Sequence, residues 1–467
     1  MKVRKEATLL HALIPLLFLA ISLFVGITQF GLDPHILIIL ATIVAATIGI
    51  FMLNCTWAEV EKGIVKSIGS AMGAILILMI IGTVIGTWML SGTVPAMIYY
   101  GLQILSPTIF LVAACLICCV VSLATGSSWT TAGTVGIALI GIGMGLGVPL
   151  GMSAGAIVSG AYFGDKLSPL SDTTNLAPAI AGTTLFSHIR SMLYTTVPAL
   201  VIALILYAIL GIRFAGNQLD YSQVNVMIDA LQGAFVITPW LLLPPVLVIT
   251  LVLLKIPALP GLLAGSILGG VFAAIFQGAG IADVLGVAHY GFSIETGVEI
   301  VDKLLNRGGL DGMMWTISLI LCALSFGGVL KATGLLDAIG KTVLKFATNT
   351  GSLVLSTVLT CIATNAFTAD QYIAIVVPGE MFKDAYKERG INANVLSRVL
   401  ESSATMTSSF FFWNTCGAFM MATLGVSPWL YVPFAFVNWL SPIIEVIYAY
   451  VGFAIFPLDE EQGSTMA

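Results

Sequence analysis

Charged residues are scarce in this sequence. Aspartate, glutamate, lysine and arginine together make up only 9% of its 467 residues, whereas soluble proteins carry about 25%. Hydrophobic residues reach 58%. This composition excludes an ordinary soluble domain and predicts a protein embedded in a lipid bilayer. The 18 basic residues form no basic face, so nucleic acid is not an expected partner.

Patterns that bind metals or cofactors are also rare. The seven cysteines lie nearly all inside apolar runs, where cysteine behaves as a small buried hydrophobe. Cys115 and Cys118 form a C-x-x-C pattern, but no second cysteine pair or histidine pair completes four zinc ligands. We therefore expect no zinc site and no cofactor.

Long apolar segments are abundant, and many can cross a hydrocarbon core of about 30 Å. The first half contains segments at 7–28, 35–53, 71–90, 107–124, 130–147, 151–164 and 192–211. The second half contains segments at 235–254, 258–276, 313–330, 353–369, 371–387, 393–425 and 429–456. The first segment follows a basic start, as in a signal peptide. It is too long and has no small-residue cleavage site, so we interpret it as a transmembrane helix.

The two halves align with each other as an internal repeat. An offset of 224 residues places Pro15 on Pro239. An offset of 242 places Gly86, Gly92 and Ala96 on Gly328, Gly334 and Ala338, and an offset of 243 places Thr125, Gly147 and Ser159 on Thr368, Gly390 and Ser402. One sizeable insertion, at 285–311, separates these registers. The predicted organisation is an N-terminus at 1–6, a first transmembrane repeat at 7–211, a polar linker at 212–234, a second transmembrane repeat at 235–456 and a tail at 457–467.

The loop charges predict that the second repeat is inverted, because short cytoplasmic loops collect lysine and arginine. Lys2, Arg4 and Lys5 place the N-terminus inside, Lys62 and Lys66 place the loop at 54–70 inside, and the uncharged loop at 91–106 lies outside. In the second repeat the equivalent loops show the opposite distribution of lysine. The loop at 278–311 is mainly acidic, and the loop at 331–349 holds Lys331, Lys341 and Lys345.

We therefore expect an all-α polytopic membrane protein built of two inverted-topology repeats with broken helices or re-entrant hairpins. Inversion needs an odd number of crossings in each repeat. Seven crossings satisfy this condition, and so do five crossings plus one re-entrant hairpin. The whole chain would then have about ten full crossings plus two hairpins, or up to fourteen segments. We expect it in the plasma (inner) membrane of a bacterium, with both termini in the cytoplasm.

Four polar stretches interrupt the apolar segments, at equivalent places in the two repeats. They cover residues 124–134 and 164–178 in the first repeat, and 363–372 and 402–415 in the second. Irregular backbone at membrane depth is tolerated only where it lines a cavity or is buried in protein. Broken helices at matching places in inverted repeats commonly form the binding site of a transporter. In the alternative interpretation, these serines and threonines only bond back to their own helices.

Three aspartates stand inside these interruptions: Asp165, Asp172 and Asp370. A charge near the bilayer centre costs about 2.5 to 3.5 kcal/mol or more, so it normally marks function. Carboxylates with hydroxyls and carbonyls offer hard oxygen ligands, which suit Na⁺ or a proton. We expect the oxygen shell to include Thr173, Asn175, Asn365, Asn414, Ser408, Thr415, Ser127 and Ser128. The open alternatives are that Asp165 only pairs with Lys166, or that Asp172 only caps a half-helix.

Other polar residues near the predicted spans are weaker candidates. Glu401 and Arg398 are one helical turn apart, so we expect them to pair with each other. Glu445, inside the last span, is an accessory candidate, as are Glu401 and Lys166. We expect His188 and Arg190 to act as anchors at the membrane interface.

The stretch GDKLSPLSDTTNLAP at 164–178, preceded by GSSWTTAGT at 126–134, resembles the NhaC family of sodium/proton antiporters within the ion transporter superfamily. The resemblance runs over essentially the whole chain. It implies that Asp165, Ser168, Asp172, Thr173, Thr174 and Asn175 help to form the ion site. Relatives in the superfamily build their sites from paired hairpins and broken helices, which favours five crossings per repeat, and they are often dimeric.

We therefore expect a secondary antiporter, not an enzyme, that exchanges Na⁺ for H⁺ by alternating access while both ions compete for buried carboxylates. The alternative is exchange coupled to a small carboxylate of the malate/lactate type or to an amino acid, bound by Lys166 and half-helix N-termini. An intramembrane aspartyl protease is disfavoured, because the sequence before Asp165 lacks the first glycine of a G-x-G-D motif. A passive channel remains a third possibility.

Overall fold

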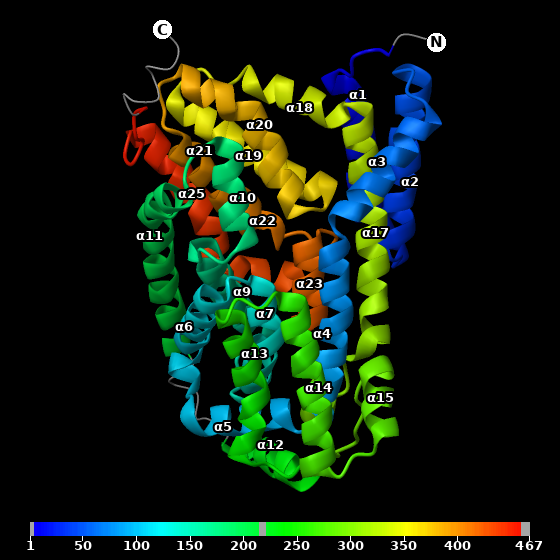
Figure 1. The fold of residues 1–467 in the computed structure, drawn as a ribbon, viewed down its shortest axis with the longest axis vertical. Coiled ribbons are helices and arrows are strands. Elements are labelled where there is room, and N and C mark those ends of the chain that lie inside the picture. Colours follow the sequence, from blue (N-terminus) through cyan, green and yellow to red (C-terminus); the bar gives the residue numbers. More distant parts are fainter. Residues whose placement is uncertain (1–3, 214–220, 459–467) are drawn as a thin grey trace.

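The computed structural model describes residues 4–213 and 221–458, and these residues are almost entirely helical (Figure 1). In these two ranges the only pairing of strand type is an isolated bridge between Ile391 and Pro457. Lys2, residues 214–220 of the predicted linker and the tail from residue 459 lie outside the described residues. The expected all-α architecture is confirmed.

The helices of the first repeat fall into three groups. Crossing helices are α1 Leu9–Phe30, α2 Pro34–Thr47 with a π turn at Ile48–Met52, α4 Met72–Leu90, the pair α9 Leu150–Leu167 and α10 Asp172–Ala181, and α11 Leu185–Ile212. The connecting helices are α3 Trp57–Ser70 and α5 Thr93–Ile104. A hairpin consists of α6 Pro107–Thr125, α7 Ser128–Thr131, a π turn at Ala132–Gly136 and α8 Ile137–Gly145.

The second repeat follows the same order after α12 Tyr221–Ala234. Its crossing helices are a 3₁₀ turn at Pro239–Leu242 with α13 Leu243–Leu253, α14 Ala258–Gln277, α17 Gly309–Thr333, a broken crossing and α25 Phe436–Val451. The broken crossing comprises α21 Ala393–Leu400, a π turn at Glu401–Thr405, α22 Met406–Ser408 and α23 Thr415–Leu424. The connecting helices are α15 Ile281–Tyr290, α16 Glu299–Leu305, α18 Leu335–Leu344 and α24 Pro428–Tyr431 with a 3₁₀ turn at Val432–Phe434. The hairpin consists of α19 Thr350–Thr368 and α20 Gln371–Glu388.

By length and apolar composition, eight helices of the described chain can each cross a membrane. They are Leu9–Phe30, Pro34–Met52, Met72–Leu90, Pro107–Thr125, Leu185–Ile212, Ala258–Gln277, Gly309–Thr333 and Thr350–Thr368. Two further helix pairs pass the same test but bend by 99° at residues 235–238 and by 85° at residues 425–427. The chain is therefore a multi-pass membrane protein.

Residues with a left-handed backbone recur in register between the repeats. The pairs are Gly31 with Lys255 and Asn54 with Gly278 at the offset of 224, Gly92 with Gly334 at 242, and Gly126 with Ala369, Gly147 with Gly390 and Gly182 with Gly425 at 243. A left-handed residue commonly ends a helix, because its N–H can then bond to a carbonyl of the last turn. The same helix ends thus occur at the same places in both copies, at the offsets that the sequence predicts.

The second copy is upside down relative to the first. The equivalent connecting helices α5 and α18 lie at opposite ends of the molecule, α5 at the lower end and α18 at the upper end (Figure 1). Likewise α3 lies in the upper part, whereas its equivalent α15 lies at the lower end. The predicted inversion is confirmed.

Each hairpin enters and leaves on one side of the molecule. The first hairpin starts after α5 and returns to it, since Gly141 of α8 packs so closely on Ile98 of α5 that a side chain at Gly141 would collide with it. The second hairpin starts after α18 and returns to it, with Gly340 of α18 packed on Met381 of α20. In each repeat the hairpin thus returns to the side from which it started, as five crossings plus one re-entrant hairpin require.

We predict that cysteines at two repeat-equivalent positions, Gln103→Cys on α5 and Lys345→Cys after α18, react from opposite sides of the membrane. Both positions are exposed, and the offset of 242 relates them. The measurement is labelling with a membrane-impermeant thiol reagent in a cysteine-depleted background, in intact cells and in inverted vesicles. Labelling of both positions from the same side would contradict the inverted arrangement.

Candidate functional site

The four predicted interruptions meet at mid-height in the molecule, where Figure 1 places α7, α9, α22 and α23 close together. Two of them are hairpin tips, at 126–127 and 369–370, and two are breaks in crossing helices, at 168–171 and 409–414. Each tip contacts the break of its own repeat. Ser128 donates to Asp165, and the Thr415 N–H donates to the Ala369 carbonyl at 2.9 Å.

A cavity of about 380 Å³ lies between these tips and breaks. It is lined by Ser127, Trp129, Asp165, Asp172, Gln371, Tyr372 and Thr415, together with Ser70, Gly73, Ala74 and Ile77 from the α3–α4 region. Both repeats therefore contribute to one cavity. Of the predicted site residues, Ser127, Asp165, Asp172 and Thr415 line it directly.

Asp165 is placed by close packing of α9 on α6. Gly160 and Gly164 of α9 touch the α6 backbone and leave no room for a side chain, and small residues permit such close approach of membrane helices. Asp165 Oδ2 accepts hydrogen bonds from the Ser128 N–H at 3.1 Å and the Ser128 hydroxyl at 2.6 Å. Its Oδ1 is buried and has no hydrogen-bond partner among the described residues. Because a buried carboxylate oxygen normally has a partner, Oδ1 is a candidate cation ligand.

Asp172 is the first residue of α10 and is exposed to the cavity. Its Oδ1 accepts the neighbouring Thr173 N–H at 2.9 Å, and its Oδ2 accepts the Tyr372 hydroxyl from the second hairpin. Ser171, and not Asp172, is the N-cap, because its hydroxyl accepts the Thr174 N–H. Asp172 therefore does more than cap a half-helix, since it also joins the two repeats across the cavity.

Glu401 does not pair with Arg398, so that prediction was wrong. Glu401 directly follows α21 and begins the π turn at Glu401–Thr405, and its side chain bonds to α10 instead. Glu401 is fully buried, and its Oε1 accepts the Thr173 hydroxyl at 2.9 Å. Its Oε2 has no partner within the described chain. Glu401 is thus a buried acid beside the first break, as is Asp165, near the exposed Asp172.

Arg398 instead forms a fully buried ion pair with Glu445 of α25, with 2.9 Å between Nε and Oε2. Glu445 Oε1 also accepts the hydroxyls of Ser402 at 2.7 Å and Thr195 at 2.9 Å. Glu445 is not among the residues that line the cavity. Its position is that of a counter-ion for Arg398.

Lys166 points away from Asp165. It is fully buried, and its Nζ donates to the Ser402 hydroxyl at 2.7 Å. That hydroxyl in turn donates to Glu445. The alternative in which Asp165 only pairs with Lys166 is therefore not observed.

His188 is fully buried and bonds to the Ser397 hydroxyl at 2.8 Å, so the expectation that it anchors at the interface was wrong. The packing of α11 on α21 buries it, and no local pattern marks that contact. Arg190 lies two residues after His188 on the same helix and is exposed, as expected.

The predicted site residues of the second repeat mainly hold the backbone. Asp370 is the N-cap of α20, with Oδ1 accepting the Ile373 N–H at 2.9 Å. Asn414 donates to Asn365 Oδ1 at 3.2 Å, and Asn365 donates to the Ala404 carbonyl at 2.6 Å. Ser408 donates to the Thr405 carbonyl at 2.7 Å. The two asparagine bonds join the second hairpin to the broken crossing, whereas the bonds of Asp370 and Ser408 are local to their own segments.

Ser168, Thr174 and Asn175 serve the first break in the same way. Ser168 Oγ accepts the Leu170 N–H, and Thr174 donates to the carbonyls of Asp165 and Lys166. Asn175 donates to the carbonyls of Pro169 and Ser171. Ser168 thus satisfies a backbone N–H, and Thr174 and Asn175 satisfy carbonyls, that the broken helix leaves free.

Sequence reasoning missed two cavity residues of the second repeat, Gln371 and Tyr372. Both lie inside or beside the interruption at 363–372, so the signal was present. A tyrosine directly after a half-helix cap is a donor that can reach a carboxylate of the other repeat.

Comparison with known proteins places these features among antiporters. Residues 160–453 match the sequence model of the Na⁺/H⁺ antiporter family. The chain is 40% identical over 444 residues to the malate-2H⁺/Na⁺-lactate antiporter of Bacillus subtilis, with 95% of each chain covered. It is 40% identical to the Na⁺/H⁺ antiporter NhaC of Alkalihalophilus pseudofirmus, over 94% of this chain and 96% of that protein. It is also 40% identical to the arginine/ornithine antiporter ArcD of Halobacterium salinarum, over 97% of this chain and 94% of that protein.

We predict that Glu445→Gln strongly lowers the thermal stability of the purified protein, because it leaves the buried Arg398 charge without its partner. Breaking a buried ion pair by removing one partner costs roughly 3 to 5 kcal/mol. The measurement is the unfolding temperature in detergent. Glu299→Gln is the control, because it removes an ion pair whose side chains are 69% and 81% exposed, and it should leave the unfolding temperature unchanged. Equal unfolding temperatures for all three proteins would contradict the structural role of Glu445.

Proposed function

Since this chain belongs to the Na⁺/H⁺ antiporter family, we propose that it exchanges Na⁺ for H⁺ across the plasma membrane by alternating access, with Asp165 and Asp172 forming the shared ion site. The observation that carries this proposal is the buried Oδ1 of Asp165, which has no hydrogen-bond partner in the described chain and belongs to a residue that lines the cavity between the repeats.

The chemistry of the cavity suits a small hard cation. Its polar lining consists mainly of carboxylate, hydroxyl and amide oxygens, the ligands that hard cations prefer. Its volume of about 380 Å³ exceeds the roughly 30 Å³ of one water molecule. The site therefore has room for Na⁺ with part of its hydration shell.

The same carboxylates give the exchange its coupling. A proton on Asp165 removes the negative charge that attracts Na⁺, and bound Na⁺ disfavours the proton in turn. One site that holds either ion, but not both, moves Na⁺ in one direction and H⁺ in the other. No separate proton pathway is needed in this scheme.

The inverted repeats provide the two states that alternating access needs. Pseudo-symmetric halves can exchange conformations around a site at their interface, which opens the site to one side and then to the other. Here the tips of both hairpins and both helix breaks bound the cavity, so relative movement of these elements changes access to it.

The distribution of basic residues supports an orientation with both described chain ends in the cytoplasm. The upper part of Figure 1 holds α3 and α18, which carry Lys62, Lys66 and Lys341. At the lower end, α5 has no charged residue. Lysine and arginine concentrate in short cytoplasmic loops, so we assign the upper end to the cytoplasm.

A second pocket favours a second candidate, exchange coupled to a small carboxylate. A cavity of about 330 Å³ is lined by four cations, Arg4, Lys62, Lys66 and Lys331, and by one acid, Glu59, and it shares Ser70 with the ion cavity. These four cations at the approach to the site would attract an organic anion. If this candidate is correct, Na⁺ movement will require an added carboxylate such as malate or lactate, and Lys62→Gln with Lys66→Gln will weaken that requirement.

We predict that Asp165→Asn and Asp172→Asn each lower Na⁺-dependent exchange by about 10-fold to 100-fold or more. Asparagine keeps the volume and one oxygen but removes the charge and the titratable proton, and an interaction with a charged group contributes about 1.5 to 3 kcal/mol. The measurement is Na⁺-induced collapse of a pH gradient in inverted membrane vesicles that contain equal amounts of each variant.

The matched control is Asp337→Asn, which changes an exposed aspartate at the start of α18 and should exchange normally. If both cavity variants also exchange normally, the aspartates are structural and the ion site lies elsewhere.

We predict that the half-saturating Na⁺ concentration rises as the pH falls, by up to about 10-fold per pH unit. The reason is reciprocity: if protons weaken Na⁺ binding, Na⁺ must weaken proton binding by the same factor. The measurement is Na⁺-induced proton release from purified protein in weak buffer. Asp165→Asn should abolish the release while Asp337→Asn preserves it. An Na⁺ affinity that does not depend on pH, with no proton released, would rule out competition for one carboxylate.

A further inference from the structure

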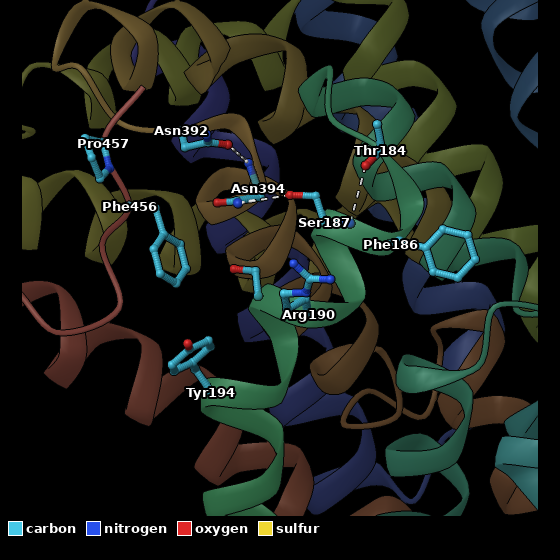
Figure 2. A pocket seen from close by; sticks show the side chains of 10 residues that line it. Thr184, Phe186, Ser187, Arg190, Tyr194, Asn392, Asn394, Phe456 and Pro457 are labelled. Carbon is cyan, nitrogen blue, oxygen red and sulfur yellow. Dashed lines mark hydrogen bonds between the residues drawn. The ribbon is translucent and has the colours of Figure 1, made fainter. Parts of the chain in front are cut away.

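A pocket outside the ion site lies at the upper end of the molecule, where α11 begins (Figure 2). Its volume is about 540 Å³, and it is walled by the first turns of α11, the start of α21 and the segment at 456–457. Its back wall is held by the bridge between Ile391 and Pro457 and by the Asn392 N–H, which donates to the Phe456 carbonyl at 2.9 Å. The mechanism proposed above does not use this pocket.

The charge of the pocket is positive. Arg190 lies between Ser187 and Tyr194 along α11 (Figure 2), and no acidic side chain lines the pocket. Among the described residues Arg190 forms no ion pair. Helices α11 and α21 both begin at this pocket, with Thr184 and Asn392 as their N-caps. Helix N-termini favour anions. Arg398 lies behind the wall and donates to Ser191, a lining residue.

One acceptor in the wall also lacks a donor. Asn394 donates through Nδ2 to the Ser187 hydroxyl at 3.1 Å, whereas its Oδ1 is buried without a partner in the described chain. This oxygen is too buried for a ligand to reach, so Arg190 determines what the pocket can bind. Its ligand needs a negative charge for Arg190 and no cationic group, because no acidic side chain lines the pocket. An anionic phosphodiester without an amine meets both conditions.

The membrane-facing surface of α11 below the pocket is apolar. Val197, Val201 and Ile205 follow Tyr194 at helical spacing and are 42%, 50% and 55% exposed. This row lies along the span Leu185–Ile212, which places it against lipid chains. A ligand in the pocket can thus extend acyl chains along this row.

We propose that this pocket binds the headgroup of an anionic phospholipid of the phosphatidylglycerol type. Arg190 pairs with the phosphate, and the acyl chains follow the exposed row of α11. Basic pockets between membrane helices on the cytoplasmic side are typical headgroup sites. This site is separate from ion exchange and holds independently of which ion the antiporter carries.

The test is thermal stabilisation of the purified full-length protein by added lipid in detergent. Phosphatidylglycerol should raise the unfolding temperature, whereas phosphatidylcholine and inorganic phosphate should not. Arg190→Gln should raise the half-saturating phosphatidylglycerol concentration roughly five-fold, as expected for loss of one interfacial charge. Arg190→Lys should lose less, because it keeps the charge.

Lys345→Gln is the matched control, because it removes an exposed cation at the same end of the molecule outside the pocket. It should respond to phosphatidylglycerol like the unmodified protein. The proposal is overturned if Arg190→Gln binds the lipid as well as the unmodified protein does, or if phosphatidylcholine stabilises equally. Stabilisation by inorganic phosphate alone that depends on Arg190 would also overturn it, by showing that the ligand is a free anion.

Discussion

The arrangement of this protein depends on one constraint: backbone groups freed at membrane depth must find partners inside the protein. Four helix interruptions meet that constraint with side chains at equivalent positions of the two repeats. Ser127 and Asp370 cap the half-helices after the two hairpin tips, and Ser171 and Asn414 cap the half-helices after the two breaks. The offset of 243 relates both pairs. The caps keep irregular backbone, with its polar side chains, around a common cavity in an otherwise apolar frame.

The charged side chains near this cavity fall into two groups, those with a partner for each buried charge and those with an unpaired oxygen. Arg398 and Glu445 neutralise each other in a fully buried pair, and Lys166 bonds to the Ser402 hydroxyl, which in turn bonds to Glu445. Asp165 and Glu401, in contrast, each retain one buried oxygen without a partner in the described chain. An uncompensated carboxylate in a low-dielectric region is costly. Binding of a cation or a proton removes that cost, which is why these acids suit an exchanger.

The sequence was sufficient to predict the architecture, because the signals were local and repeated. The inverted repeats followed from the apolar segments, from the alignment of the two halves and from the exchange of lysine between equivalent loops. The four interruptions followed from their helix-breaking residues. The sequence predicted the carboxylates Asp165 and Asp172 for the same reason. It failed where a contact depends on packing between distant segments. Arg398 pairs with Glu445, 47 residues further along the chain, instead of with Glu401, and Tyr372 reaches Asp172 across 200 residues of chain.

The central claim is that one cavity between the repeats couples Na⁺ to H⁺ without a further substrate. The most direct test is uptake of radioactive Na⁺ into proteoliposomes that contain only the purified protein, with a pH gradient imposed across the membrane. The account predicts that an interior more acidic than the medium drives Na⁺ to accumulate inside above its external concentration, and that this excess is lost when an ionophore collapses the pH gradient. Na⁺ that only equilibrates, or that accumulates only after a small carboxylate is supplied, would contradict it.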